Sequence, residues 1–77
     1  MTKLPVLTAA QLVKILRRLG FDFLRQKGSH AFFRHLDGRA TVVPMHHGED
    51  LGRGLLRAIL RDIEMTVEQF EAVRKDL

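Results

Sequence analysis

The sequence predicts an α+β domain of two layers, in which two amphipathic helices cover one face of a three-stranded antiparallel sheet. Apolar residues recur at helical spacing in two segments, residues 8–20 and 53–63. Between these segments lie three short runs rich in Phe and Val, at residues 21–27, 30–35 and 39–44. Turn signals separate the three runs, so we expect them to form the sheet, with its other face open to solvent or to a ligand.

The first helix has both a start signal and a stop signal. Thr8 and Gln11 form a capping box, in which each side chain accepts a hydrogen bond from the other residue's backbone N–H. Four apolar side chains then share one helical face: Leu12, Ile15, Leu16 and Leu19. Gly20 suits the left-handed turn that ends a helix, so the helix is expected to end there.

Turn residues define the three strands. Asp37-Gly38 between the second and third runs predicts a hairpin whose two central residues both take positive φ. Pro44 is expected to end the third strand, because proline cannot donate to a ladder. If His30 points away from the helices, Phe32 and Arg34 share its face. A register slip of one residue would reverse these assignments.

A loop and two further helices complete the chain. Residues 45–54 contain three glycines and two adjacent histidines, which is typical of a loop. The helix over residues 53–63 buries one apolar face, made of Leu56, Ile59, Leu60 and Ile63. Arg53, Arg57 and Arg61 recur every fourth residue and form a cationic stripe beside that face.

Thr66 and Gln69 form a second capping box, which predicts a short C-terminal helix packed through Val67, Phe70 and Val73.

Length and composition limit the class of protein. The 77 residues have room for one domain, residues 1–77, and the absence of cysteine excludes disulfides and thiolate zinc sites. No stretch resembles a membrane span or a signal peptide, so we expect a cytoplasmic protein that does not bind membranes. The formal net charge of +4 suits a polyanionic partner such as nucleic acid or an acidic protein, although an ordinary solvated surface is equally consistent with it.

Histidine is the first candidate for catalysis, because its ordinary pKa allows proton transfer near neutral pH. His30 follows Lys27, Gly28 and Ser29, where free turn amides beside a lysine can receive a phosphate oxygen. There the imidazole could take the proton of a ribose 2′-hydroxyl or give one to the leaving 5′-oxygen. Such a reaction needs no metal and spares DNA. Taken alone, however, the tripeptide Gly28-Ser29-His30 favours a histidine that only forms a hydrogen bond across a strand edge.

Neither a metal site nor a cofactor site is predicted. His46 and His47 are adjacent, and His30 and His35 would point to opposite faces of a strand. None of these spacings matches the helical histidine pair or the Cys/His patterns of zinc sites. No glycine-rich nucleotide loop is present either.

An open sheet face with His, Phe and Arg suits RNA, since a ring stacks a base and a guanidinium holds phosphate. The arginine stripe is a second candidate surface for phosphate, or else a solvated face or a docking surface for an acidic protein. The predicted RNA contacts are Lys27, Gly28, Ser29, Phe32, Arg34, His46, Arg53, Arg57 and Arg61.

Four segments in this order, KGSHAFFRH, TVVPMH, GRGLLRAILRD and TVEQF, resemble the HicA toxins of HicA–HicB toxin–antitoxin pairs, from about residue 8 to residue 71. The resemblance implies a fold like a double-stranded-RNA-binding domain, a ribonuclease that cuts mRNA and arrests translation, and His30 as the catalytic histidine. It also implies a HicB-like antitoxin that covers the His30 region in a hetero-oligomer. The family commonly has Gly where this chain has Glu64, and Thr where it has Leu55.

The leading hypothesis is therefore a metal-independent endoribonuclease toxin with His30 as general acid or base. The second proton-transfer group stays open between His46, Lys27 and water. One alternative is a non-catalytic module that binds structured RNA, in which His30 is a contact only. Another is a subunit that only binds a partner protein.

Overall fold

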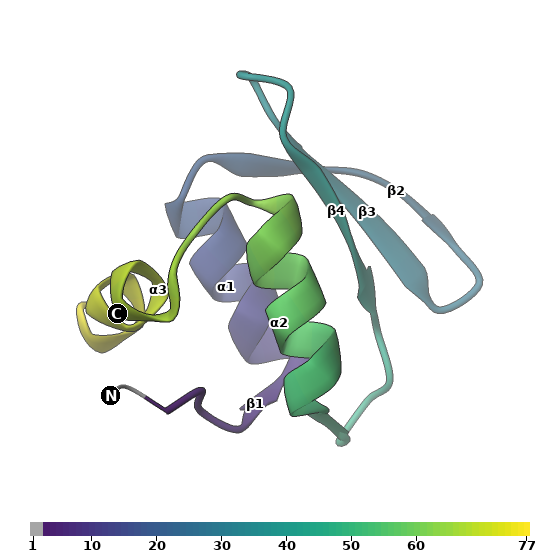
Figure 1. The fold of residues 1–77 in the computed structure, drawn as a ribbon. Coiled ribbons are helices and arrows are strands. Elements are labelled where there is room, and N and C mark those ends of the chain that lie inside the picture. The colour runs from purple at the N-terminus through teal and green to yellow at the C-terminus, as the bar shows by residue number, and fades with distance from the viewer. Residues whose placement is uncertain (1–2) are drawn as a thin grey trace.

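The structure, a computed structural model, describes residues 3–77, so residues 1–2 of the predicted domain lie outside the described residues. The elements follow in the order β1 (Leu7–Thr8), α1 (Ala9–Arg18), β2 (Phe21–Lys27), β3 (His30–His35), β4 (Ala40–Pro44), β5 (Asp50–Leu51), α2 (Arg53–Asp62) and α3 (Val67–Lys75) (Figure 1). The predicted helices and the three long strands are confirmed. The short strands β1 and β5 were not expected.

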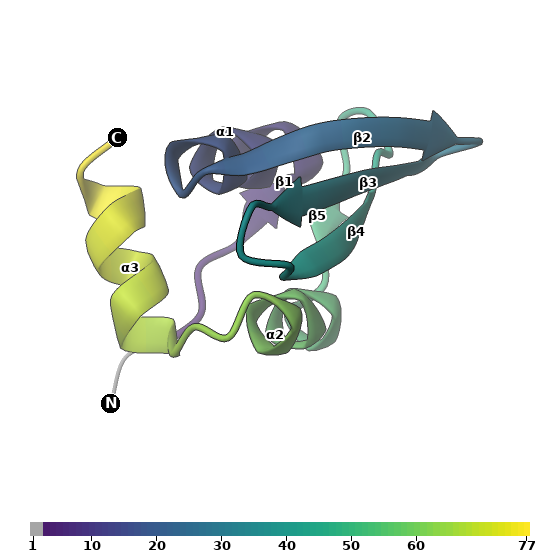
Figure 2. The same ribbon diagram turned by 90° about the horizontal axis from the view of Figure 1, so that it is seen from above.

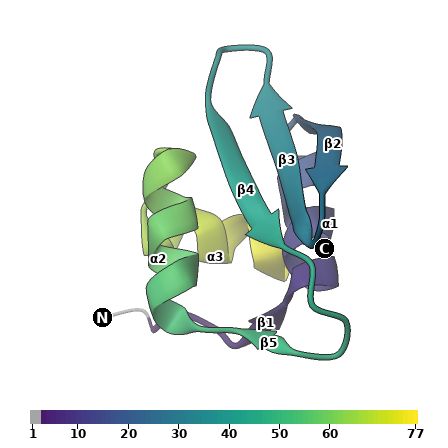
Figure 3. The same cartoon turned by 90° about the vertical axis from the view of Figure 1, so that its right-hand side faces the viewer.

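The three long strands form one antiparallel sheet in the order β2-β3-β4. Helices α1 and α2 lie on one face of this sheet, and α3 lies behind them, on the side away from the sheet (Figure 2). Seen from the other side, the sheet faces the viewer with no helix in front of it (Figure 3). The predicted α+β architecture is therefore confirmed, and one sheet face is open.

The core lies between the sheet and the helices. Its fully buried side chains come from every layer and include Leu12, Ile15, Leu16, Phe21, Val43, Leu56, Ile59, Ile63 and Phe70. Along β3, Ala31 and Phe33 are buried, whereas His30 and Arg34 are exposed and Phe32 is half-buried. This alternation confirms that His30, Phe32 and Arg34 point away from the helices.

Both predicted capping boxes are present. Thr8 Oγ1 accepts from the Gln11 N–H at 3.2 Å, and Gln11 Oε1 accepts from the Thr8 N–H at 2.9 Å. The same reciprocal pair joins Thr66 and Gln69. Each box satisfies backbone donors that would otherwise have no partner at a helix start. These caps fix where α1 and α3 begin.

The predicted geometry of the second hairpin is wrong at Asp37. Gly38 has a φ of +100°, but Asp37 does not have a positive φ. The His35 carbonyl accepts from the Gly38 N–H, and the His35 N–H donates to the Arg39 carbonyl, so the loop has three residues and ends in a left-handed glycine. The Asp37 carboxylate accepts from the Arg39 N–H, which is the main reason that its pKa lies below the ordinary 3.8. This bond holds Asp37 in its turn conformation.

Helix α2 ends on a strained residue. Glu64 has a φ of +56° and is the one non-glycine residue between 3 and 77 with positive φ. The Met65 N–H donates to the Leu60 carbonyl and the Glu64 N–H to the Arg61 carbonyl, which is the Schellman pattern that glycine usually completes. Glu64 therefore carries a side chain in a left-handed backbone conformation that favours glycine.

Replacing Glu64 with glycine is expected to raise the free energy of unfolding by about 0.5–1 kcal/mol. Relief of the left-handed strain exceeds the extra entropy that glycine gains in the unfolded chain. Urea titration followed by circular dichroism measures the change. Glu64→Ala is the matched control, because it removes the carboxylate but keeps the Cβ. An equal gain with alanine would contradict the strain argument.

Candidate functional site

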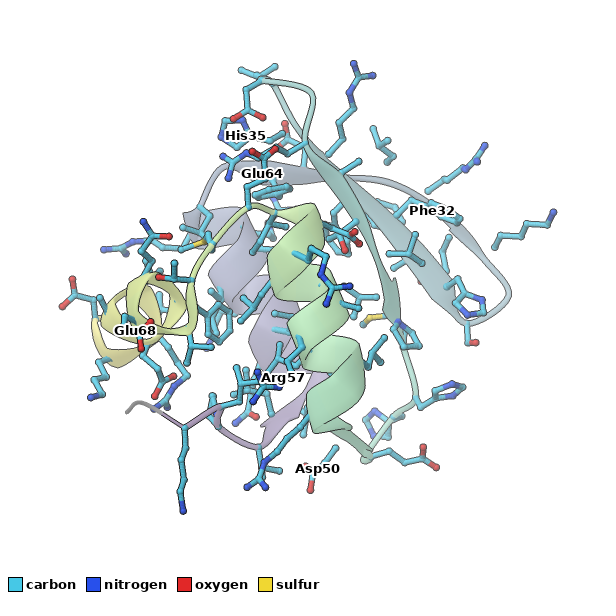
Figure 4. The ribbon with its side chains drawn as sticks, in the orientation of Figure 1. Phe32, His35, Asp50, Arg57, Glu64 and Glu68 are labelled. Carbon is cyan, nitrogen blue, oxygen red and sulfur yellow. The ribbon has the colours of Figure 1, made fainter. Side chains whose placement is uncertain are left out.

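The open sheet face carries three rows of side chains, because directly paired residues of neighbouring strands point to the same side. One row joins Lys27, His30 and Pro44, the next joins Arg25, Phe32 and Val42, and the last joins Asp22, Arg34 and Ala40. Phe32 lies on the side of the sheet turned away from the helices (Figure 4). We call these three rows the open face.

A β-bulge decides which side chains of β2 reach the open face. Phe23 pairs with Phe33, but the next pair is Arg25 with Phe32, so Leu24 has no partner in the register. Counting in strict alternation from the buried Phe21 would send Arg25 and Lys27 toward the helices. The extra residue reverses the alternation and places both cations beside His30 and Phe32.

His30 is exposed, and among residues 3–77 its imidazole makes no hydrogen bond or ion pair. His35, on the same strand, contrasts with it. Its Nδ1 accepts from the Asp37 N–H at 3.0 Å, and its ring packs edge-on against Phe21 with the centroids 5.2 Å apart. His35 therefore has a structural role, whereas His30 does not form the strand-edge hydrogen bond that the simpler interpretation required.

The turn before His30 is accessible to a phosphate. Gly28 has a φ of +58°, and a Cβ placed on it would meet no atom within 4 Å. Within the described residues, neither the Gly28 nor the Ser29 N–H donates a backbone hydrogen bond. Two amides without a backbone partner, next in sequence to a lysine, are suited to holding an anionic oxygen.

The loop after β4 approaches the same end of the sheet. The Met45 N–H donates to the Ser29 carbonyl at 2.6 Å, so His46 follows directly after the contact with the turn. His46 and His47 are exposed and line an open pocket of about 480 Å³ with Gln26, Met45 and the start of α1. The loop is anchored beyond this point by β5, where Leu51 pairs with Leu7. His46 therefore remains a candidate for the second proton-transfer group, together with Lys27.

The arginine stripe lies elsewhere. Thr41 Oγ1 donates to Asp62 Oδ2 at 2.9 Å, so the Asp62 side of α2 faces β4. At 100° per residue, Arg57 and Arg61 lie on other sides of the helix, and both line a groove with Thr66 and Val67 near the start of α3. Arg57 points away from the sheet (Figure 4). The structure therefore places Arg57 and Arg61 away from His30. Contact of Arg53, Arg57 and Arg61 with RNA stays a prediction.

Arg25 is the functional candidate that sequence reasoning missed. Its guanidinium carbon lies 4.9 Å from the centroid of the Phe32 ring, within the range of a cation–π contact. The position of the bulge decides that Arg25 faces Phe32, and no glycine or proline marks this bulge in the sequence. The two-residue turn at Gly28-Ser29 was the one available signal, because it fixes the pairing of Lys27 with His30 and hence of Arg25 with Phe32.

Within residues 3–77, no three His, Cys, Asp or Glu side chains lie together in a way that could hold a metal ion. None of the helices in this range has the length and apolar composition of a membrane span.

Comparison with known proteins places the chain in a family. A sequence profile described as "HicA toxin of bacterial toxin-antitoxin" matches residues 9–65, which is most of the chain. The chain belongs to the HicA toxin family. It is also similar to a protein of Pseudomonas fluorescens (strain Pf0-1) named "Probable mRNA interferase HicA", with 38% identity over 48 residues, covering 62% of this chain and 78% of that protein.

The HicA match includes the whole open face and the turn at Gly28-Ser29. It ends at residue 65, so α3 lies beyond it. The part of the chain that carries the candidate site is therefore also the part that defines the family.

Proposed function

We propose that this HicA-family chain is a metal-independent endoribonuclease that cuts mRNA and inhibits translation, with His30 as general acid or base. The observation that supports it best is the exposed imidazole of His30 directly opposite Lys27 at the end of the open face, with no hydrogen-bond or ion-pair partner within residues 3–77. The similarity to a protein named "Probable mRNA interferase HicA" supports the choice of mRNA as substrate.

The reaction uses the substrate's own 2′-hydroxyl. His30 accepts the 2′-hydroxyl proton while the 2′-oxygen attacks phosphorus, and the P–O5′ bond breaks as the 5′-oxygen takes a proton. The products are a 2′,3′-cyclic phosphate and a 5′-hydroxyl. Lys27 and the free amides of Gly28 and Ser29 stabilise the charge on the phosphoryl oxygens. Lys27, His46 or water supplies the second proton transfer.

We further propose a HicB-like antitoxin as the partner, in a cytoplasmic hetero-oligomer that neutralises the toxin by covering the open face. The support is the family assignment together with an uncovered surface on a small chain of net charge +4. An antitoxin with an acidic surface would bind this face and keep RNA away from His30.

Incubating the purified chain with a long transcript tests the activity. We expect cleavage that persists in a chelator, fragments that end in cyclic phosphate, and no cleavage of DNA of the same sequence. Fragments that end in 3′-hydroxyl, or cleavage that a chelator abolishes, would contradict the mechanism. Intact RNA of shifted mobility would instead support the second candidate, an RNA-binding module, which the exposed basic face also favours.

A further inference from the structure

The side chains in the second row of the open face have no role in the proposed cleavage reaction. Arg25, Phe32 and Val42 lie side by side on three strands, with the Arg25 guanidinium over the Phe32 ring. Phe32 is half-buried, and no helix of residues 3–77 covers it, so part of its side-chain surface remains open to a ligand. The row is a flat cationic and aromatic surface.

This row lies immediately beside the row that contains His30. His30 and Phe32 are two residues apart on one strand, which corresponds to roughly 6.7 Å. That distance is close to the length of one nucleotide in an extended RNA strand. A phosphate at Lys27 and His30 therefore places a neighbouring base within reach of Arg25 and Phe32.

We propose that Arg25 and Phe32 form a stacking subsite for one unpaired base next to the cleaved phosphate, and that the substrate is consequently single-stranded RNA. The inference rests on the proposed function, which places the phosphate at His30. A base stacks on the Phe32 ring or on the outer plane of the Arg25 guanidinium, and both are surfaces that proteins use for unstacked bases. Because any base can stack, this subsite distinguishes single-stranded from double-stranded RNA more than it distinguishes one base from another.

A duplex would not satisfy this arrangement. In an A-form helix the bases are paired and stacked within the duplex, so none is available to a protein ring. The 2′-oxygen of a duplex also does not lie in line with the P–O5′ bond, which the cleavage reaction requires. The layout resembles that of double-stranded-RNA-binding domains, but the open face has the chemistry of a single-strand surface.

Binding of uncleavable RNA tests the proposal independently of catalysis. Short RNAs with 2′-O-methyl groups, one single-stranded and one duplex of the same sequence, are titrated with the full chain and followed by fluorescence anisotropy. We expect the single strand to bind at least about tenfold more tightly than the duplex. Equal affinity for the two would overturn the proposal.

Variants of the subsite should weaken single-strand binding. Phe32→Leu and Arg25→Gln are each expected to reduce affinity about 5- to 100-fold, while Phe32→Tyr retains most of it. Combining Phe32→Leu with Arg25→Gln should cost less than the product of the two, because the side chains act as one stack. Arg17→Gln, which removes an exposed charge from α1, is the matched control and should change affinity less than about twofold. Unchanged affinity in Phe32→Leu would refute the stacking role.

A scan of abasic positions uses the unmodified protein and so does not depend on how the variants fold. One abasic position should weaken binding far more than the others if a single base stacks. A uniform response along the strand would refute the subsite. If the unmodified chain does not cleave RNA but gives the expected binding results, the proposed ribonuclease function is wrong and the stacking subsite is still supported.

Discussion

Replacing His30 with alanine is expected to reduce RNA cleavage by about 100- to 10,000-fold, the usual contribution of a general acid–base group. The fold should be unaffected, since the side chain is exposed and has no hydrogen bond or ion pair within residues 3–77. We expect the free energy of unfolding to stay within about 0.5 kcal/mol of the original chain. Cleavage of a labelled transcript and urea titration of the same preparation measure the two effects.

Two other histidines provide matched controls. His47→Ala removes an exposed loop histidine and should leave both cleavage and stability unchanged. His35→Ala should lower the free energy of unfolding by about 1–2 kcal/mol, because the Asp37 N–H loses its acceptor and Phe21 loses its edge contact. Full cleavage by purified His30→Ala protein would refute the catalytic assignment.

The catalytic assignment also requires that the His30→Ala variant still binds RNA. If His30 moves protons, then the alanine variant should still bind uncleavable RNA, since Lys27 and Arg25 remain on the same face. A parallel loss of binding and cleavage would instead indicate that His30 is a contact residue. That result would favour the non-catalytic RNA-binding module.

Most of the fold was predictable from sequence because its signals are local. The capping pairs at Thr8 and Thr66 fixed two helix starts, and apolar periodicity identified the buried faces of α1 and α2. The alternation along β3 predicted that His30, Phe32 and Arg34 share one face, and the burial pattern shows that this face is the outer one. Each of these signals depends on residues within a few positions of one another.

The remaining features depend on contacts between distant segments. The β1–β5 pair joins Leu7 to Leu51, and two-residue strands have no periodicity to detect. The bulge at Leu24 is a shift in how β2 pairs with β3, from Phe23 opposite Phe33 to Arg25 opposite Phe32, so it cannot be seen in the sequence of β2 alone. The arginine stripe was correctly identified as a helical stripe, but its direction depends on how α2 rests on β4 through Asp62 and Thr41. Residue spacing within α2 therefore could not show that this stripe points away from His30.

Replacing Phe70 with alanine is expected to lower the free energy of unfolding by about 3–5 kcal/mol. Phe70 is completely buried and, within residues 3–77, is the apolar residue of α3 that belongs to the buried core. Helix α3 itself lies on the side of α1 and α2 away from the sheet (Figure 2). A domain of this size has a limited core, so such a loss removes much of its stability. Urea titration measures the change, and Leu36→Ala, at a side chain that is 94% exposed, should stay within about 0.5 kcal/mol.

The same variant separates stability from activity. Helix α3 lies on the side of α1 and α2 that is opposite the sheet, and it is also beyond the residues that match the family profile. Cleavage per folded molecule should therefore be unchanged in Phe70→Ala at low temperature, while the unfolding midpoint falls. A change below about 1 kcal/mol would show that α3 is not needed for the core. A large loss of cleavage by fully folded protein would show that the open face depends on α3, which none of its described contacts predicts.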